Sequence, residues 1–249
     1  MLEPVWTFFE ELNRNTGINL PIFYDAFDRE RFFRGLLNTI WLSLLCIVLS
    51  VVIGIVGAWV QGAKSRFLRA VVQGYIQFFR NTPPLVQLYF FYFAVGSVLS
   101  RTGENGLTEP LVSNYAWAII SLSFFAGAFN VEIFRAGIEA VPNSTREAAE
   151  SLGFSRLQTY IYVVLPLAIR VSLPALNNNV VNLTKTTTLA YAIAVPELLY
   201  VSSLVWSDQY NVREMMNVLL VTYVLLIGIL VFAMRRWEAA LRIPGYGRS

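Results

Sequence analysis

Four long stretches of this sequence lack Asp, Glu, Lys and Arg, and they constrain the fold more than any other feature. Each stretch is rich in Leu, Ile, Val and Phe. They are residues 35–63, 81–100, 110–131 and 215–234. A helix needs about 20 predominantly apolar residues to cross the hydrocarbon core of a bilayer. The sequence therefore predicts four membrane-spanning helices.

A fifth candidate span, residues 157–184, is apolar except for Arg170 but contains Pro166 and Pro174. Proline removes a backbone donor and clashes with the preceding helical turn. We therefore expect a helix from about residue 165 to 187, broken or kinked near the prolines. Such breaks are tolerated in a membrane where the helix faces protein or a water-filled cavity, so this span is expected in the interior of the bundle.

Composition agrees with a membrane protein. Hydrophobic residues make up 56% of the chain and charged residues only 14%, against about 25% charged in a typical soluble domain. We expect an all-α membrane protein of about five transmembrane helices, forming a single domain over residues 1–249. Residues 1–34 are expected to be an extracytoplasmic or interfacial arm, and they lack the basic start and apolar run of a cleavable signal peptide.

Several functions are excluded by residue types that are missing. The chain has no His and a single Cys, Cys46. It therefore has no histidine base, no disulfide and no Cys-rich or His-rich metal site. The predicted spans also lack paired carboxylates, which argues against an intramembrane enzyme. We expect no catalytic residue and no metal ligand set.

The basic residues indicate an orientation, because an odd number of spans places the two termini on opposite sides. Six Lys and Arg residues fall on one side, in residues 1–34, 101–114 and 187–214, and twelve fall on the other, in residues 62–80, 135–170 and 235–249. Basic residues are enriched on the cytoplasmic side. The N-terminus is therefore expected outside and the C-terminus in the cytoplasm.

Two charged residues, Glu132 and Lys185, belong to neither side and are placed within the membrane. Intramembrane charges are costly and usually mark a substrate or ion pathway. A structural salt bridge between the two helices, or a span boundary that is wrong by one turn, is the alternative.

The segment between the third and fourth spans carries local helix signals. Ser144 and Glu147 have the spacing of a capping box, which predicts a short helix over residues 145–152. Gly153 suits the left-handed position that ends a helix, and Ser155 with Gln158 is a second capping box. A doubly capped segment favours a docking element, whereas an ordinary loop with an incidental helix is the alternative.

This segment resembles the EAA loop of bacterial ABC importer permeases. The residues that carry the resemblance are Glu147, Ala148, Ala149, Gly153, Leu165 and Pro166. In that family the loop is a coupling helix that fits into a cleft of the ATPase subunit, and the small alanines would allow close contact. The resemblance implies that residues 144–153 couple this chain to a separate ATPase.

Three further stretches are similar to the polar amino-acid branch of these permeases. They are residues 78–88, 132–138 and 182–189, and the resemblance extends over roughly residues 35–200. It implies the permease subunit of an ATP-driven amino-acid importer in the cell inner membrane. Thr186 stands where some members, including ones that take basic amino acids, have Asp.

The resemblance also implies partners. They are a second permease subunit, identical or different, two ATP-binding subunits, and an extracytoplasmic substrate-binding protein. ATP and Mg would be bound by the partner ATPase, because this chain has no G-x-x-x-x-G-K-[ST] phosphate-binding loop. No cofactor on this chain and no nucleic acid are expected.

A polar stripe marks the candidate substrate site. Asn178, Asn182 and Lys185 are spaced i, i+4, i+7, which places them on one helical face. The hydroxyl groups lie close by in sequence, at Thr186, Thr187 and Thr188. For a zwitterionic amino acid, the hypothesis is that Lys185 binds the carboxylate, Glu132 binds the ammonium group, and Gln87 adds an amide contact. The alternative is interhelical hydrogen bonding, which averages about 0.6 kcal/mol in membranes.

Two other functions remain open at this point. One is a permease for another small polar solute, which ligand data would distinguish. The other is a transporter or channel subunit that works without ATP and has no use for the helix at 144–153.

Overall fold

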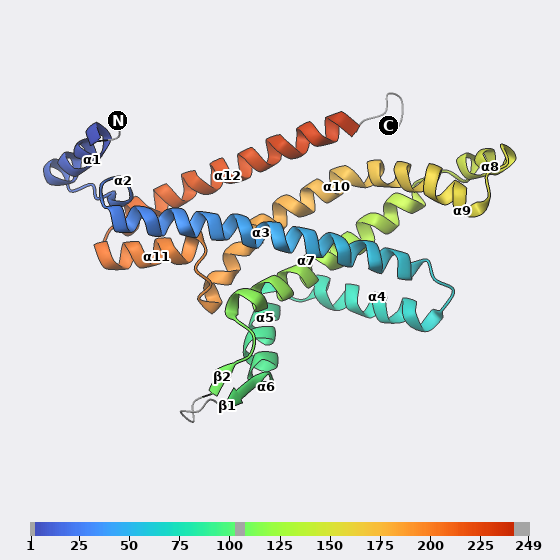
Figure 1. The fold of residues 1–249 in the computed structure, drawn as a ribbon, viewed down its shortest axis with the longest axis horizontal. Coiled ribbons are helices and arrows are strands. Elements are labelled where there is room, and N and C mark those ends of the chain that lie inside the picture. Colours follow the sequence, from blue (N-terminus) through green and yellow to red (C-terminus); the bar gives the residue numbers. More distant parts are fainter. Residues whose placement is uncertain (1–2, 103–107, 242–249) are drawn as a thin grey trace. The chain divides into compact units, whose positions relative to one another are not determined.

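The computed structural model describes residues 3–102 and 108–241, and this part of the chain is helical apart from one short hairpin (Figure 1). The α-helices are α1 (Glu3–Thr16), α2 (Pro21–Tyr24), α3 (Ala26–Gln61), α4 (Arg66–Asn81), α5 (Pro84–Tyr89), α6 (Gly96–Val98), α7 (Asn114–Glu139), α8 (Asn143–Ser151), α9 (Arg156–Thr159), α10 (Leu165–Thr186), α11 (Leu198–Gln209) and α12 (Val212–Leu241). Two π-helical segments, η1 (Phe90–Val95) and η2 (Tyr160–Val164), and one 3-10 segment, η3 (Thr187–Ile193), continue neighbouring helices.

Four helical stretches of the described chain are long and apolar enough to cross a membrane. They are Ala26–Gln61, Asn114–Glu139, Arg156–Ile193 and Val212–Leu241. A fifth stretch, Pro84–Val98, is apolar but shorter. An all-helical membrane protein is thus confirmed, with the second of the five predicted spans shorter than expected. The prolines at 83 and 84 delay the start of that helix, and the chain leaves it for strand β1.

The first span begins earlier than the sequence predicted. Helix α3 begins at Ala26 and not at residue 35, so the N-terminal arm consists of α1, α2 and the first turns of α3. The Asp25 carboxylate accepts a hydrogen bond from the Asp28 backbone N–H at 2.9 Å, which supports the start of the helix. The charge-free run begins only after Arg34, and a membrane helix can extend beyond the membrane into charged residues, which is why α3 starts earlier than this run.

The connecting segments contain helices that the sequence reading missed. Helices α4 and α11 both lie between predicted spans. A small antiparallel hairpin joins β1 (Ser100–Thr102) to β2 (Thr108–Pro110), with Arg101 opposite Glu109. Their side chains form an ion pair of 3.1 Å.

The fifth predicted helix, from about residue 165 to 187, corresponds to α10 at Leu165–Thr186, and the break predicted as one alternative to a kink near its prolines is wrong. The chain is helical without interruption over the 38 residues Arg156–Ile193, and Pro174 lies inside α10. The wide turns of η2 end directly before Leu165 and Pro166, where the missing proline N–H cannot support an ordinary turn. The helical stretch ends at Ala194, whose φ is +57°.

The fold consists of two compact units, each assembled from three chain segments. Unit 1 contains Met1–Leu45, Leu88–Ile119 and Thr184–Gly228, and unit 2 contains Cys46–Gln87, Ile120–Leu183 and Ile229–Ser249. Helices α3, α7, α10 and α12 each contribute residues to both units.

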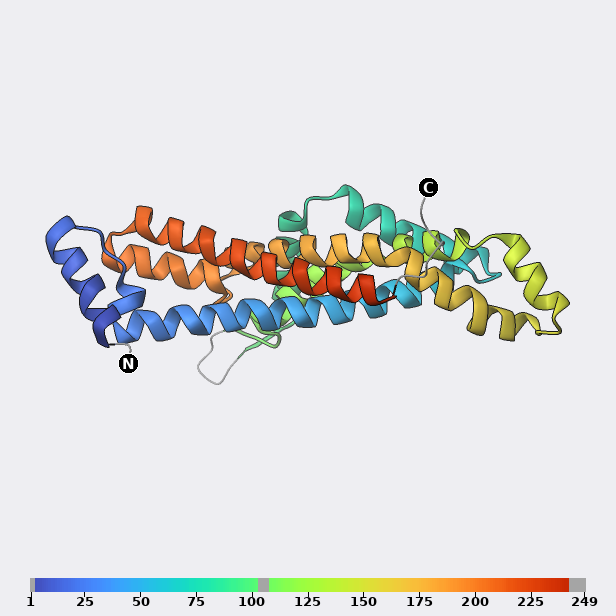
Figure 2. The same ribbon diagram turned by 90° about the horizontal axis from the view of Figure 1, so that it is seen from above.

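In unit 1, α11 packs against the first half of α3 (Figures 1 and 2). Gly35 allows this contact, because a Cβ at that position would lie 3.0 Å from Cβ of Val201. The Leu198 N–H donates to Oγ1 of Thr39 at 2.9 Å. Leu198 belongs to the core of the unit, which also includes Ile22, Phe32, Val205, Met215 and Leu219.

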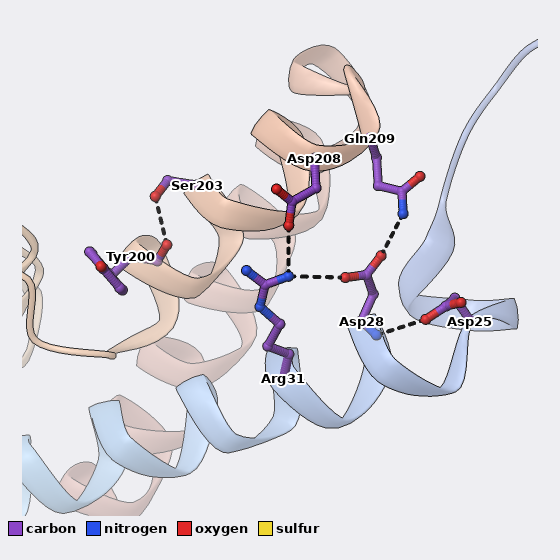
Figure 3. Close-up of polar contacts among 7 residues, drawn as sticks. All are labelled: Asp25, Asp28, Arg31, Tyr200, Ser203, Asp208 and Gln209. Atoms are coloured by element: carbon purple, nitrogen blue, oxygen red, sulfur yellow. Dashed lines mark hydrogen bonds and ion pairs between the residues drawn. The ribbon is translucent and has the colours of Figure 1, made fainter.

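A polar clamp holds the other end of α11 to the start of α3 (Figure 3). Nη1 of Arg31 lies 2.9 Å from Asp208 on α11 and 3.5 Å from Asp28 on its own helix. The Gln209 amide donates to Asp28 at 3.0 Å. One arginine therefore neutralises carboxylates from both helices and fixes the C-terminal turn of α11.

In unit 2, glycines allow α3 and α7 to approach closely. A side chain at Gly54 would collide with Asn130, and one at Gly57 would collide with Val131. Small residues permit such close backbone contact between membrane helices. The contact brings Ser50 within hydrogen-bonding distance of Asn130.

Candidate functional site

Helix α8 is the short helix predicted after the third span, with one change at its start. It begins at Asn143, with Pro142 as its N-cap and no side-chain capping bond. The predicted Ser144–Glu147 capping box is therefore wrong, because Ser144 lies inside the first turn and cannot cap it. Thr145 instead donates its backbone N–H to the Pro142 carbonyl at 3.1 Å.

The end of α8 follows the prediction. Gly153 has φ +93°, the left-handed conformation that glycine tolerates best. The Phe154 N–H returns to the Ala149 carbonyl at 3.2 Å. Ser155 and Gln158 form the predicted capping box that starts α9, with bonds of 2.9 and 3.3 Å. Figure 1 shows α8 and α9 as a bent pair joined at this turn.

The coupling motif combines exposed and buried residues of unit 2. Glu147, Ala148, Leu165 and Pro166 are exposed, whereas Ala149 is buried. Arg146 anchors α8 by donating to the Ile138 carbonyl at 2.9 Å. A small core of Val141, Val164 and Ala168 lies in the same region. The helix therefore has a fixed inner face and a free outer face carrying a carboxylate and a methyl group.

The three residues of the predicted polar stripe on α10 share one exposure class. Asn178, Asn182 and Lys185 are all exposed, whereas their neighbours Asn177 and Asn179 are buried. None of the ion pairs among the described residues includes Lys185. Asn178 and Asn182 therefore present exposed amide groups in unit 2, and Lys185 presents an exposed cation in unit 1.

The three threonines after Lys185 differ in their surroundings. Thr187 is fully buried and donates its hydroxyl hydrogen to the Thr184 carbonyl at 2.8 Å. Thr188 bonds to the Lys185 carbonyl, also at 2.8 Å, and Thr186 is half-buried. The hydroxyl groups of Thr187 and Thr188 therefore satisfy backbone carbonyls where α10 tightens into η3.

Asn179, next to the stripe, connects helices within unit 2. Its amide donates to Oδ1 of Asn130 at 2.8 Å and to the Ala126 carbonyl at 3.1 Å, and Asn130 in turn donates to Ser50 at 3.2 Å. No local signal separates this asparagine from Asn178, since adjacent residues of the same type differ only in the helix face that they occupy.

We expect Asn179→Ala to lower the stability of the folded permease by about 1–2 kcal/mol, because the carbonyl of Asn130 would lose its buried donor. Asn178→Ala is the matched control, since that side chain is exposed. Thermal unfolding in detergent measures both. Equal midpoints for the two variants would contradict a structural role for the connection.

Glu132 forms an ion pair with Arg80. The arginine lies on α4, a helix missed from the sequence, and its guanidinium also sits 5.3 Å from the Phe129 ring centroid. The sequence does not indicate this partner for Glu132, because Arg80 lies in the segment that connects the first two predicted spans. A local cation therefore balances the carboxylate inside unit 2.

The side chain of Gln87 is buried and bonded to the preceding turn. Its Nε2 lies within 3.0 Å of the carbonyls of Phe79 and Thr82 and of the Thr82 hydroxyl. Gln87 is 2% exposed, and its Oε1 has no hydrogen-bond partner in the described part of the chain. The amide donor is thus used to hold the turn between α4 and α5.

Glu197 is a buried carboxyl group that the sequence reading did not single out. It lies between spans in unit 1 and is fully buried. It accepts backbone N–H bonds from Leu199 at 3.0 Å and Tyr200 at 2.7 Å, and a hydroxyl bond from Tyr223 at 3.1 Å. It therefore caps α11 and ties that helix to α12. The acidic residues before and after it in the sequence, Glu150 and Asp208, are exposed. The residue type alone therefore could not show that Glu197 is buried.

Burial raises the pKa of Glu197 to about 7. A raised pKa means that the folded state favours the protonated acid. The stabilisation from protonated Glu197 is therefore complete below pH 4.5, the pKa of the group in the unfolded chain, and is lost as the pH rises through 7. We expect up to about 3 kcal/mol of stability to be lost over this range, and Glu197→Gln to flatten the loss. Unfolding midpoints at pH 5 and pH 8 test this, with Glu150→Gln as the control for removal of a carboxyl. An unchanged pH dependence in Glu197→Gln would refute it.

A family model provides the decisive comparison. The model described as "binding-protein-dependent transport system inner membrane component" matches residues 50–241. The chain belongs to this family. It is therefore a multi-pass inner-membrane permease subunit of an ABC transporter, and the ATPase is a separate chain. The predictions of this family, of a transport subunit and of an inner-membrane location are confirmed.

Relatives of this permease share most of its length. It is 30% identical over 206 residues to the histidine/lysine/arginine/ornithine transport system permease protein HisM of Salmonella typhimurium, covering 83% of this chain and 88% of HisM. It is 29% identical over 209 residues to the glutamine transport system permease protein GlnP of Escherichia coli, covering 84% and 92%. A crystal structure of an amino acid ABC transporter with histidines matches with a TM-score of 0.75 and 26% identity, covering 85% and 94%.

Proposed function

We propose that this permease provides the translocation pathway of an ATP-driven amino-acid importer. The observation that carries the proposal is the match to two permeases for different amino acids, each over more than four fifths of this chain. A match over a short motif would support only the family. A match along the whole pathway-forming region supports the substrate class that the relatives have in common.

The family implies partners of two kinds, a binding protein and an ATPase. We propose a complex of this permease, acting as one domain, with a second permease subunit, two ATP-binding subunits and an extracytoplasmic binding protein. ATP and Mg would bind to the ATPase subunits. In the proposed orientation the N-terminus is extracytoplasmic and the C-terminus cytoplasmic. Part of the basic C-terminal segment, residues 242–249, lies outside the described residues.

Helix α8 is the proposed contact with the ATPase. Its outer face carries Glu147 and Ala148, and its inner face is anchored through Arg146 and Ala149. Closure of the ATPase subunits would push on the outer face, and the anchored inner face would pass the movement to α7 and α10. Gly153 and the exposed Leu165 and Pro166 would set the angle between α8 and the long helix that follows.

For substrate contact we propose the exposed stripe of α10. Lys185 would bind the amino-acid carboxylate, and Asn178 and Asn182 would offer amide groups along the same helix face. A cation without an ion-pair partner is costly in a membrane, so an anionic substrate group would stabilise it. Thr186, Thr187 and Thr188 are proposed to shape the end of this stripe.

We propose Glu132 and Gln87, which both belong to unit 2, as additional contacts with the substrate. A carboxylate has two oxygens and can accept several donors. Arg80 pairs with Oε2 of Glu132, so Oε1 could receive an ammonium group. Gln87 would contribute through its unpartnered Oε1, since its nitrogen is bonded to the turn.

The test is co-purification of this permease with an ATPase, followed by ATPase assays with binding protein loaded from a panel of amino acids. We expect stimulation of severalfold by one or more amino acids. Stimulation only by another polar solute would replace the proposed substrate class while leaving the family assignment intact. Because Thr186 is not acidic, neutral and basic amino acids should both be in the panel.

A further inference from the structure

Unit 1 contains a groove that is lined by none of the residues proposed for transport. Its volume is about 1000 Å³. The N-terminal helices α1 and α2, the first turns of α3 and the first half of α12 form it. Most of its lining is apolar, including Phe32, Phe33, Val218, Val221 and Leu225. Of these, Phe33, Val221 and Leu225 are more than half exposed, so the groove is open to whatever surrounds the chain.

The lining of the groove carries an excess of basic residues. Arg29 and Arg213 both line it, together with a single acidic residue, Glu214. Arg213 is paired with Glu214 at 2.9 Å. Nη1 of Arg29 is buried and has no hydrogen-bond partner in the described part of the chain, and none of the ion pairs found there includes it. The lining therefore has an excess positive charge with an unsatisfied buried donor.

The two arginines lie at the starts of two long apolar helices. Arg29 lies in the first turn of α3 and Arg213 in the first turn of α12, and both helices are long enough to span a membrane. The Arg29 guanidinium sits 4.5 Å from the Trp6 ring centroid. Tryptophan and basic residues concentrate at the membrane–water interface, where lipid headgroups lie.

We propose that this groove binds one anionic phospholipid. Its phosphate would lie against Arg29 and Arg213, and an acyl chain would extend along Val218, Val221 and Leu225 of α12. The apolar lining requires a hydrocarbon ligand, because a free anion would leave it exposed to water. The buried donor of Arg29 requires an anion, which an apolar surface of a second copy would not supply. Lipid bound here would fasten α1 and α2 to the spans.

The test is native mass spectrometry of the purified full-length permease in detergent, titrated with phosphatidylglycerol or phosphatidylcholine. We expect tighter binding of phosphatidylglycerol. Arg29→Gln should weaken it by about fivefold, the loss expected for one basic residue near a membrane surface, while Arg29→Lys should retain most of it. Arg34→Gln is the control, since Arg34 is exposed and paired with Glu30 instead of lining the groove.

A second pair of variants tests the apolar part without removing a buried group. Val221→Trp would fill the groove and should reduce phosphatidylglycerol binding to the level of phosphatidylcholine. Val224→Trp, at an exposed position on the same helix outside the lining, should leave binding unchanged. Equal lipid binding by the two tryptophan variants would overturn the proposal. Displacement of the lipid by millimolar inorganic phosphate would also overturn it, as would a change of subunit number in Val221→Trp alone, which would assign the groove to a second copy.

Discussion

Replacing Lys185 with Met is expected to reduce ATP-driven amino-acid uptake by about a hundredfold, while the assembled transporter remains intact. Removing one partner of a desolvated charge pair typically costs several kcal/mol, and the loss would fall on every substrate that carries a carboxylate. Methionine keeps an unbranched apolar stem and is only one atom shorter. Lys185 is exposed and lies in the last turn of α10, so the packing of the chain should change little.

The sequence contains one other lysine, Lys64, which is also exposed and provides a matched control. Lys64→Met should transport at the parental rate, and Lys185→Arg should recover part of the activity by restoring a cation. Uptake by proteoliposomes is compared after normalising for assembled complex. Parental uptake by Lys185→Met would remove this residue from the proposed site without affecting the family assignment.

Reversing the charge of Glu147 is the second large effect. We expect Glu147→Arg to reduce ATPase activity stimulated by loaded binding protein to the basal level. The side chain is exposed on the outer face of α8. An arginine there would present a positive charge to the ATPase surface in place of the negative charge of Glu147. Helix α8 should still form, because its start at Pro142 and its end at Gly153 do not involve the Glu147 carboxylate.

Glu150→Arg makes the same charge change one turn along α8, also at an exposed position. If Glu147 marks the contact, Glu150→Arg should retain most of the stimulation, and basal hydrolysis should be similar in both variants. Full stimulation in Glu147→Arg would show that α8 meets the ATPase through another residue. Loss of complex assembly in both variants would instead assign the whole outer face to docking.

The apolar spans and the turn at Gly153 could be predicted because their causes are local. A run of apolar residues indicates a membrane helix whatever surrounds it, and Gly153 needs only its own φ to end α8. The Ser155–Gln158 box also depends on residues three positions apart. The Ser144–Glu147 box has the same spacing and did not form, because α8 starts two positions too early for Ser144 to cap it.

The remaining features depend on contacts between segments that are distant in sequence. The charge of Arg80 assigned it to a connecting segment, and only the position of α4 shows that it meets Glu132. Gln87 lies in a charge-free run, and only the fold shows that its amide nitrogen holds the turn at Thr82, which leaves Oε1 for the proposed contact. Glu197 was one acidic residue among several, until the fold enclosed it with Tyr223. Three-dimensional proximity decides each of these roles.

The most direct test of the central claim is uptake of a radiolabelled amino acid by proteoliposomes that contain the complete complex and loaded binding protein. One sample contains ATP, and the other contains ADP, on the side of the liposome membrane where the ATPase subunits lie. The account predicts accumulation above the external concentration with ATP and none with ADP. Equal uptake in both samples would contradict it, because this chain would then conduct its substrate without an ATPase.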